Sequence, residues 1–150
     1  MATSFTSLHV HMVFSTKHRA GLIDDELQGP LFQYIGGILR NEKSALVAAG
    51  GMSDHVHLLV SMGKELSVSA AVRLVKANSS KWVHEEFAQR HGFGWQDGYG
   101  AFAVSYSNLA STRQYIANQA EHHRTRTFQE EFVLLLEKHG IQYEPKYLWD

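Results

Sequence analysis

Ser53-Asp54-His55-Val56-His57-Leu58-Leu59-Val60 is the stretch that decides the fold of this chain. Side chains alternate between the two faces of an extended strand, so His55 and His57 project together while the aliphatic residues between and after them face a core. Two neighbouring neutral imidazoles on a strand offer half of a divalent-metal site. The same pattern is also typical of two histidines on the solvent-exposed face of an ordinary strand, which bind no metal.

The spacing of apolar residues around this strand predicts a regular order of elements. Asp24 or Asp25 is expected to cap the first helix and Ser67 the second, while Pro30 suggests a start or a kink in the first. In chain order, the expected elements are strand 8–14, helix 27–39, strand 44–49, strand 56–62, helix 67–90 and strand 101–106.

Two more helices are expected after the last strand. Ser107 or Asn108 caps the first, which runs to about residue 123, and Thr127-x-x-Glu130 forms a capping box for the second. The first six elements give the split βαβ order of an α+β, ferredoxin-like or RRM-like fold, in which two helices cover one face of an antiparallel sheet. The other face is expected to stay open and to carry the two histidines.

The composition indicates one globular domain over residues 1–150. Hydrophobic residues make up 44% of the chain, which is enough to bury a single core. The absence of cysteine excludes disulfides and leaves any metal to histidine, carboxylate, amide or water ligands. No apolar run approaches the roughly 20 residues of a membrane span, and no signal peptide is evident, so we expect a cytoplasmic protein without membrane contact. A net charge of −1 disfavours a protein that coats nucleic acid without specificity.

A second segment carries chemistry on the first of the C-terminal helices. Tyr115 and Gln119 are four residues apart, a spacing that places both side chains on one helix face. His122 and His123 follow three and four residues later, so one of them can share this face. A surface helix whose tyrosine packs on the sheet is the alternative.

Four segments resemble a known family, the HUH-type, single-tyrosine transposases of the smallest bacterial insertion sequences. The resemblance extends over about residues 8–140, in the order and spacing of that family. The segments are His11-Met-Val-Phe-Ser-Thr-Lys17, Asp54-His-Val-His-Leu-Leu59, Trp95-Gln-Asp-Gly-Tyr-Gly-Ala-Phe102 and Tyr115-Ile-Ala-Asn-Gln-Ala-Glu-His-His123.

The resemblance implies an enzyme with a divalent metal and a tyrosine nucleophile. It assigns the metal ligands to His55, His57 and Gln119, and the nucleophile to Tyr115. The expected ion is Mg²⁺ or Mn²⁺, and the imidazoles favour Mn²⁺ or a looser site completed by water and phosphate. Attack of Tyr115 on a phosphate of DNA would form a covalent 5′-phosphotyrosine and free a 3′-hydroxyl. A 3′-hydroxyl of another strand can then attack the phosphotyrosine and rejoin the DNA without ATP.

The resemblance also implies partners. The expected substrate is single-stranded DNA with a short hairpin near each element end, and the expected assembly is an obligate homodimer. In such dimers the tyrosine helix of one subunit completes the histidine pair of the other, although a site formed within one subunit stays open as an alternative. Two other functions remain: a host-adapted relative of the REP-associated kind that cleaves hairpins, and a catalytically silent dimeric module that binds single-stranded DNA.

Weaker candidates surround this constellation. Asp54 either orients a metal-binding histidine or closes the turn before the strand, and His122 is a weaker metal or supporting ligand. His9 and His11 share a strand face and either border the site or are structural. Candidate phosphate contacts, for each of which a plain solvated charge is the alternative, are Lys17, Arg19, Arg73, Lys76, Lys81 and Arg113.

Overall fold

A four-stranded antiparallel sheet forms the centre of the molecule in the computed structural model, which describes residues 3–149. Residues 1, 2 and 150, the ends of the predicted domain, lie outside the described residues. The strand order is β2-β3-β1-β4, the arrangement of a split βαβ fold. The strands are β1 (His9–Ser15), β2 (Ala45–Met52), β3 (His55–Ser61) and β4 (Gly100–Val104). The predicted fold is confirmed.

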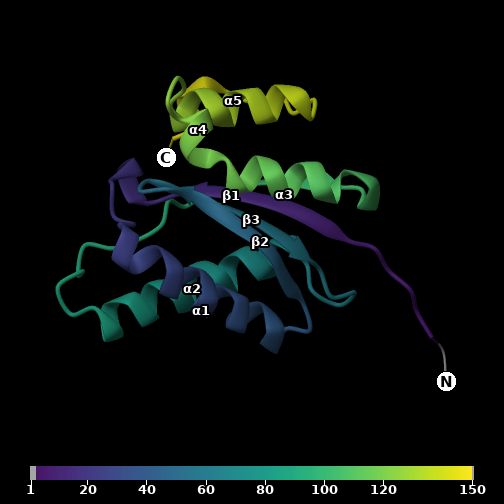
Figure 1. Ribbon diagram of the computed structural model, residues 1–150, viewed down its shortest axis with the longest axis horizontal. Coiled ribbons are helices and arrows are strands. Elements are labelled where there is room, and N and C mark those ends of the chain that lie inside the picture. The colour runs from purple at the N-terminus through teal and green to yellow at the C-terminus, as the bar shows by residue number, and fades with distance from the viewer. Residues whose placement is uncertain (1–2, 150) are drawn as a thin grey trace.

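Helices α1 (Asp25–Asn41) and α2 (Val68–Glu86) cover one face of this sheet (Figure 1). As predicted, Asp24 caps α1 by accepting from the amide of Leu27, and Ser67 caps α2 by accepting from the amide of Ala70. Pro30 does not start α1, because the helix begins five residues earlier and continues past it. The main core lies between these helices and the strand side chains opposite the histidines.

The second face of the sheet is also covered, which contradicts the prediction of an open face. Figure 1 shows α3 (Leu109–Ala117), α4 (Gln119–His122) and α5 (Phe128–Lys138) on this side. Helix α5 is amphipathic, and an apolar helix face must be buried against another element. A second core therefore forms between the sheet and α5. It contains Val13, Phe102, Phe128, Phe132, Leu135 and Leu136.

The C-terminal elements differ in detail from the predicted ones. The single helix expected up to residue 123 is divided at Asn118 into α3 and α4. The capping box of α5 is present: Thr127 and Glu130 each bond to the backbone amide of the other. The described part of the chain also contains three short 3-10 helices: η1 (Lys17–Arg19), η2 (Tyr106–Asn108) and η3 (Pro145–Tyr147). Within residues 3–149, no helix is long and apolar enough to cross a bilayer.

Candidate active site

The two histidines of β3 lie side by side on the sheet face beneath the C-terminal helices. Both side chains are fully buried, because α3, α4 and α5 cover this face. Each ring has one nitrogen engaged by a neighbour: His55 Nδ1 lies 2.7 Å from Asp54 Oδ1, and His57 Nδ1 lies 2.8 Å from His11 Nε2. These contacts leave the Nε2 atoms of both rings facing the helices. Asp54 is thus placed to orient His55, and His11 to orient His57.

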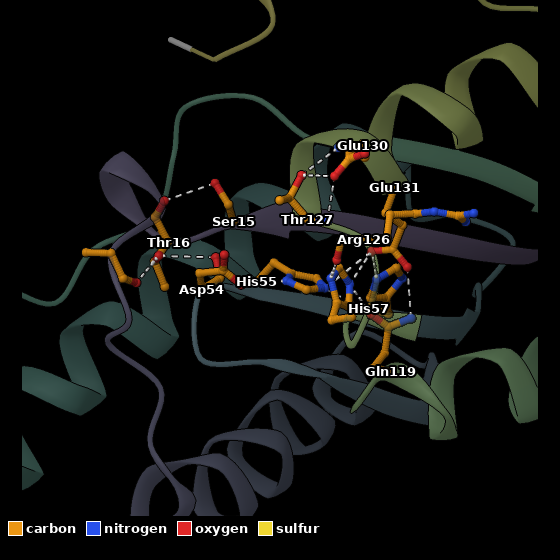
Figure 2. A network of polar contacts seen from close by, with 12 residues as sticks. Ser15, Thr16, Asp54, His55, His57, Gln119, Arg126, Thr127, Glu130 and Glu131 are labelled. Atoms are coloured by element: carbon orange, nitrogen blue, oxygen red, sulfur yellow. Dashed lines mark hydrogen bonds and ion pairs between the residues drawn. The ribbon is translucent and has the colours of Figure 1, made fainter. Parts of the chain in front are cut away.

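A buried carboxylate from α5, Glu131, meets both Nε2 atoms (Figure 2). Its Oε1 atom lies 3.0 Å from His57 Nε2 and 3.4 Å from His55 Nε2. One ligand atom from each of these three residues lies within 4.8 Å of the others. Sequence reasoning missed Glu131, although it stands on the apolar stripe of α5, where an acid is unexpected without a partner.

Tyr115 and Gln119 reach the same cluster from the helices above. Gln119 Oε1 lies 3.0 Å from His55 Nε2, and Gln119 Nε2 donates to Glu131 Oε2 over 3.0 Å. The hydroxyl of Tyr115 donates to the same Oε2 atom, and the Tyr115 ring centre lies 5.8 Å from that of His57. One chain therefore brings together all four residues that the resemblance singled out.

The two histidines at the end of α4 occupy different places. His123 joins the cluster, with Nε2 3.0 Å from Glu131 Oε1 and 3.2 Å from Gln119 Oε1. His122, the weaker candidate from sequence, instead stacks on the Tyr115 ring with centroids 4.5 Å apart. Its Nε2 atom is buried and has no hydrogen-bond partner within residues 3–149. His122 thus contacts the tyrosine ring, and His123 contacts the carboxylate.

The charges of the cluster follow from its contacts. Burial opposes ionisation of Glu131, but bonds from His55 and His57 hold its pKa far below the usual range. Burial also opposes protonation of His55, yet Asp54 and Glu131 raise its pKa to about 9. For His57 burial prevails and its pKa is lowered. The protein groups alone therefore hold a carboxylate beside one imidazolium, whereas two neutral imidazoles were expected.

The surroundings of Tyr115 disfavour its phenolate. Burial first, and then the neighbouring Glu131, raise the pKa of the Tyr115 hydroxyl above its ordinary value near 10. A nucleophilic tyrosine here needs a positive charge nearby when it reacts. A cavity of about 360 Å³ borders the ring between β4, α3 and α5. Its polar lining includes His11, Asn108, Thr112, Lys138 and His139.

The donor set fits a divalent ion. Two imidazole nitrogens, a carboxylate oxygen and an amide oxygen converge, and such mixed sets bind first-row divalent metals. Binding requires His55 to release its proton, so an ion and a proton compete for this nitrogen. Burial of the charged Glu131 carboxylate costs free energy, and a bound ion would be a further partner that offsets this cost.

Lys76, one of the candidate phosphate contacts, holds the loop that follows α2. Its ammonium donates to the backbone carbonyls of Gln96, Asp97 and Gly98 over 2.8, 3.2 and 2.7 Å. It also lies 5.0 Å from the centre of the Phe14 ring. These contacts explain Lys76 as the anchor of the glycine-rich loop after α2.

The remaining candidate phosphate contacts differ in their surroundings. Arg19 packs 5.2 Å over the ring of Trp149, and Lys81 makes a 4.0 Å surface pair with Glu85. Surface pairs of this kind contribute little to stability. The other three are exposed: Lys17, Arg73 and Arg113.

Comparison with known proteins identifies the family. The family model described as "Transposase IS200 like" matches residues 4–119. The chain belongs to this family of DNA transposases. It is 28% identical over 120 residues to the transposase for insertion sequence element IS200 of Salmonella typhimurium, covering 74% of this chain and 76% of that protein. It is 24% identical over 117 residues to the ISDra2 transposase TnpA of Deinococcus radiodurans, covering 75% and 84%.

Solved structures agree in fold. A crystal structure of a candidate transposase from Deinococcus radiodurans R1 superposes with a TM-score of 0.63 at 27% identity, covering 79% of this chain and 95% of that one. A REP-associated tyrosine transposase bound to a REP hairpin superposes with a TM-score of 0.61 at 14% identity, covering 82% and 72%. The second likeness concerns the fold alone.

Proposed function

We propose that this chain cleaves and rejoins single-stranded DNA at hairpin-bearing element ends, with Tyr115 as the nucleophile. The observation that carries the proposal is the shared carboxylate: Glu131 contacts the histidine pair and the Tyr115 hydroxyl at once. This contact supports the proposal, because the Tyr115 hydroxyl lies next to a set of groups that could hold a metal ion. Attack of a hydroxyl on a metal-polarised phosphate needs the hydroxyl and the ion within reach of one phosphate.

The divalent ion, Mg²⁺ or Mn²⁺, would be held by His55 and His57 with Gln119 as a further ligand. When bound, it supplies charge that polarises the scissile phosphate and stabilises a nearby phenolate. Asp54 and His11 hold the two rings in the orientation that presents Nε2. The covering helices keep bulk water away from these groups.

Cleavage would proceed by in-line attack of the Tyr115 oxygen on phosphorus. The new bond joins the tyrosine oxygen to phosphorus, and the bond to the 3′ oxygen breaks. The proton that the Tyr115 hydroxyl gives up balances the proton that the 3′ oxygen takes as it leaves as a hydroxyl. The phosphotyrosine retains the energy of the phosphodiester, so a second 3′-hydroxyl can attack it and restore a DNA strand. The cavity beside Tyr115 offers space for a nucleotide flanking this phosphate.

Single-stranded hairpins are the proposed substrate and the cytoplasm is the proposed location. The structural relative bound to a REP hairpin supports the substrate class for this fold. A net charge of −1 favours recognition of shape and of a few phosphates over a broad basic surface. The host-adapted alternative would use the same chemistry on the same kind of hairpin.

Incubating the protein with a hairpin oligonucleotide and Mn²⁺ tests the proposal through a denaturant-stable protein–DNA adduct. Wild type should form the adduct and Tyr115→Phe should not. Tyr106→Phe, which removes the hydroxyl of a tyrosine that is 77% exposed, is the matched control and should behave as wild type. An adduct with Tyr115→Phe would reassign the nucleophile. No adduct from wild type with its own flanking hairpins would favour the silent binding module.

We further propose that the enzyme is a homodimer that exchanges the tyrosine helix between subunits. In the single chain α3 packs on its own β2, and an exchanged α3 would bury the same surface of the partner. Mixing Tyr115→Phe with His57→Ala distinguishes the two assemblies. A shared site restores adduct formation, because one site of the mixed dimer has both residues intact. Sites formed within one subunit leave the mixture inactive.

A further inference from the structure

Glu131 presents its two carboxylate oxygens to two different sets of groups. Oε1 faces the imidazoles, 3.0 Å from both His57 Nε2 and His123 Nε2. Oε2 faces the nucleophile side, where it accepts from the Tyr115 hydroxyl and from Gln119 Nε2. The side chain is only 2% exposed, so both oxygens are used within the protein.

The position of Glu131 is determined by the second core. Phe128, Phe132 and Leu135 anchor the buried face of α5 against the sheet, and Glu131 lies on that same face. An apolar residue would cost less to bury there, since a buried ion pair repays its desolvation only with several good contacts. The family model ends at residue 119, so this carboxylate lies outside the matched segment.

We propose that Glu131 is a metal ligand and a positioning residue at once: Oε1 binds the ion held by His55 and His57, while Oε2 holds the Tyr115 hydroxyl. The proposal rests on the function proposed above and adds α5 to the catalytic centre. Binding through Oε1 requires no rearrangement of the carboxylate, because that oxygen already faces both Nε2 atoms.

The two oxygens make the proposal more specific than a structural ion pair. A carboxylate has two acceptors, so it can bind an ion through one and orient a hydroxyl through the other. An amide of the same shape has a single acceptor oxygen and can serve only one of these partners. Glu131→Gln therefore separates the bridging role from simple filling of space.

The test measures Mn²⁺ binding to the whole chain without DNA, by the electron paramagnetic resonance signal of free Mn²⁺. We expect Glu131→Gln to weaken Mn²⁺ binding by about 10-fold or more, the order found for groups that hold or support a metal. Glu137→Gln, an exposed acid on the same helix, is the matched control and should bind as wild type. Unchanged Mn²⁺ affinity in Glu131→Gln would overturn the ligand role.

Adduct formation at saturating Mn²⁺ tests the second half of the proposal. If Oε2 positions the nucleophile, Glu131→Gln stays slower than wild type even when the ion is bound. A wild-type rate under these conditions would overturn the positioning role. Tyr115→Phe should keep wild-type Mn²⁺ affinity. The Mn²⁺ titration therefore tests the ligand role of Glu131 independently of adduct formation, and it remains valid if no adduct forms and the proposed function fails.

If Glu131→Gln does not fold, a measurement on the wild-type protein still tests the proposal. Anomalous diffraction from crystals loaded with Mn²⁺ locates the ion directly. An ion about 2.0–2.3 Å from Oε1 supports the ligand role, because oxygen ligands bind such cations at this range. An ion on the histidines but out of bonding distance of both Glu131 oxygens refutes it.

Discussion

Replacing Gly50 with alanine should displace the helix that carries Tyr115. Gly50 pairs with His57 across β2 and β3, so it faces the same side as the histidines. A Cβ atom added there would overlap the carbonyl oxygen of Ile116 and come within 3.0 Å of Ile116 Cγ2. Ile116 is buried and directly follows Tyr115. The methyl group must therefore push α3 away from the sheet.

The cost can be worked from this contact. Overpacking of a close interface costs ~1–3 kcal/mol, and here a backbone oxygen cannot rotate away. A displacement of the nucleophile approaching 1 Å can cost about 100-fold in rate. We expect Gly50→Ala to lower the free energy of unfolding by about 2 kcal/mol and to slow adduct formation by about 10- to 100-fold.

Urea unfolding and the rate of adduct formation at saturating Mn²⁺ measure the two effects. Gly29→Ala is the matched control, because a Cβ on Gly29 of α1 meets nothing within 4 Å. That substitution should leave the rate unchanged and stabilise the helix by about 0.5–1 kcal/mol. If Gly50→Ala unfolds and reacts like wild type, α3 does not rest on β2 as described, whether from its own chain or a partner.

Three further substitutions test single contacts. Burial, and then the neighbouring His57, lower the pKa of His11 to about 3. The unfolded chain therefore takes up this proton first, and His11 should contribute a loss of up to about 5 kcal/mol in the stability of wild type between pH 6.5 and 3. His11→Gln should reduce the acid slope of unfolding measured with EDTA and leave the part due to His57, whose pKa is also lowered. Asp54→Asn should weaken Mn²⁺ binding about 10-fold by calorimetry, since it replaces the charged carboxylate that orients His55 with a neutral amide, a weaker acceptor. Lys76→Met should lower the free energy of unfolding, measured in urea, by about 1–3 kcal/mol, because three carbonyls lose their donor.

Each of these has its own contradicting result. An acid slope of unchanged size in His11→Gln would mean that His11 does not take up the proton. Unchanged Mn²⁺ affinity in Asp54→Asn would mean that the aspartate only closes the turn. Weaker hairpin binding by Lys76→Met with unchanged stability would restore that lysine as a phosphate contact.

The parts of the fold that depend on local chemistry were predictable from sequence. Period-two alternation located the strand of His55 and His57, and hydroxyl and carboxylate caps located the helix starts at Asp24, Ser67 and Thr127. These signals lie within a few residues of what they determine. The order of the six elements then left few arrangements open.

The covering of the histidines was not predicted, although a signal for it exists. Helix α5 has an apolar stripe, formed by Phe128, Phe132 and Leu135, that had to be buried. The sheet face that α1 and α2 leave uncovered was the surface available to it. Glu131 lies on that stripe, and a charge at a buried position indicates that a polar or charged partner is buried beside it. Tyr115 and Gln119 were predicted to share a face, and both reach the cluster although the helix breaks between them at Asn118.

Charge counting could not assign the candidate DNA contacts. Lys76 faces three carbonyls and an aromatic ring, and no sequence pattern distinguishes such an anchor from a solvated lysine. The pKa of His55 likewise depends on Asp54 beside it and on Glu131 76 positions later. Long-range contacts of this kind depend on tertiary packing and not on local pattern.

The position of α5 after the strands it covers has a consequence for synthesis. A ribosome releases β1 and β4 before residues 128–138, so the face bearing Val13 and Phe102 meets water or another protein until α5 has been made. Glu131 arrives with α5. A nascent chain therefore has Tyr115 before it has the acid that contacts it, and the finished arrangement forms only after α5 has left the ribosome.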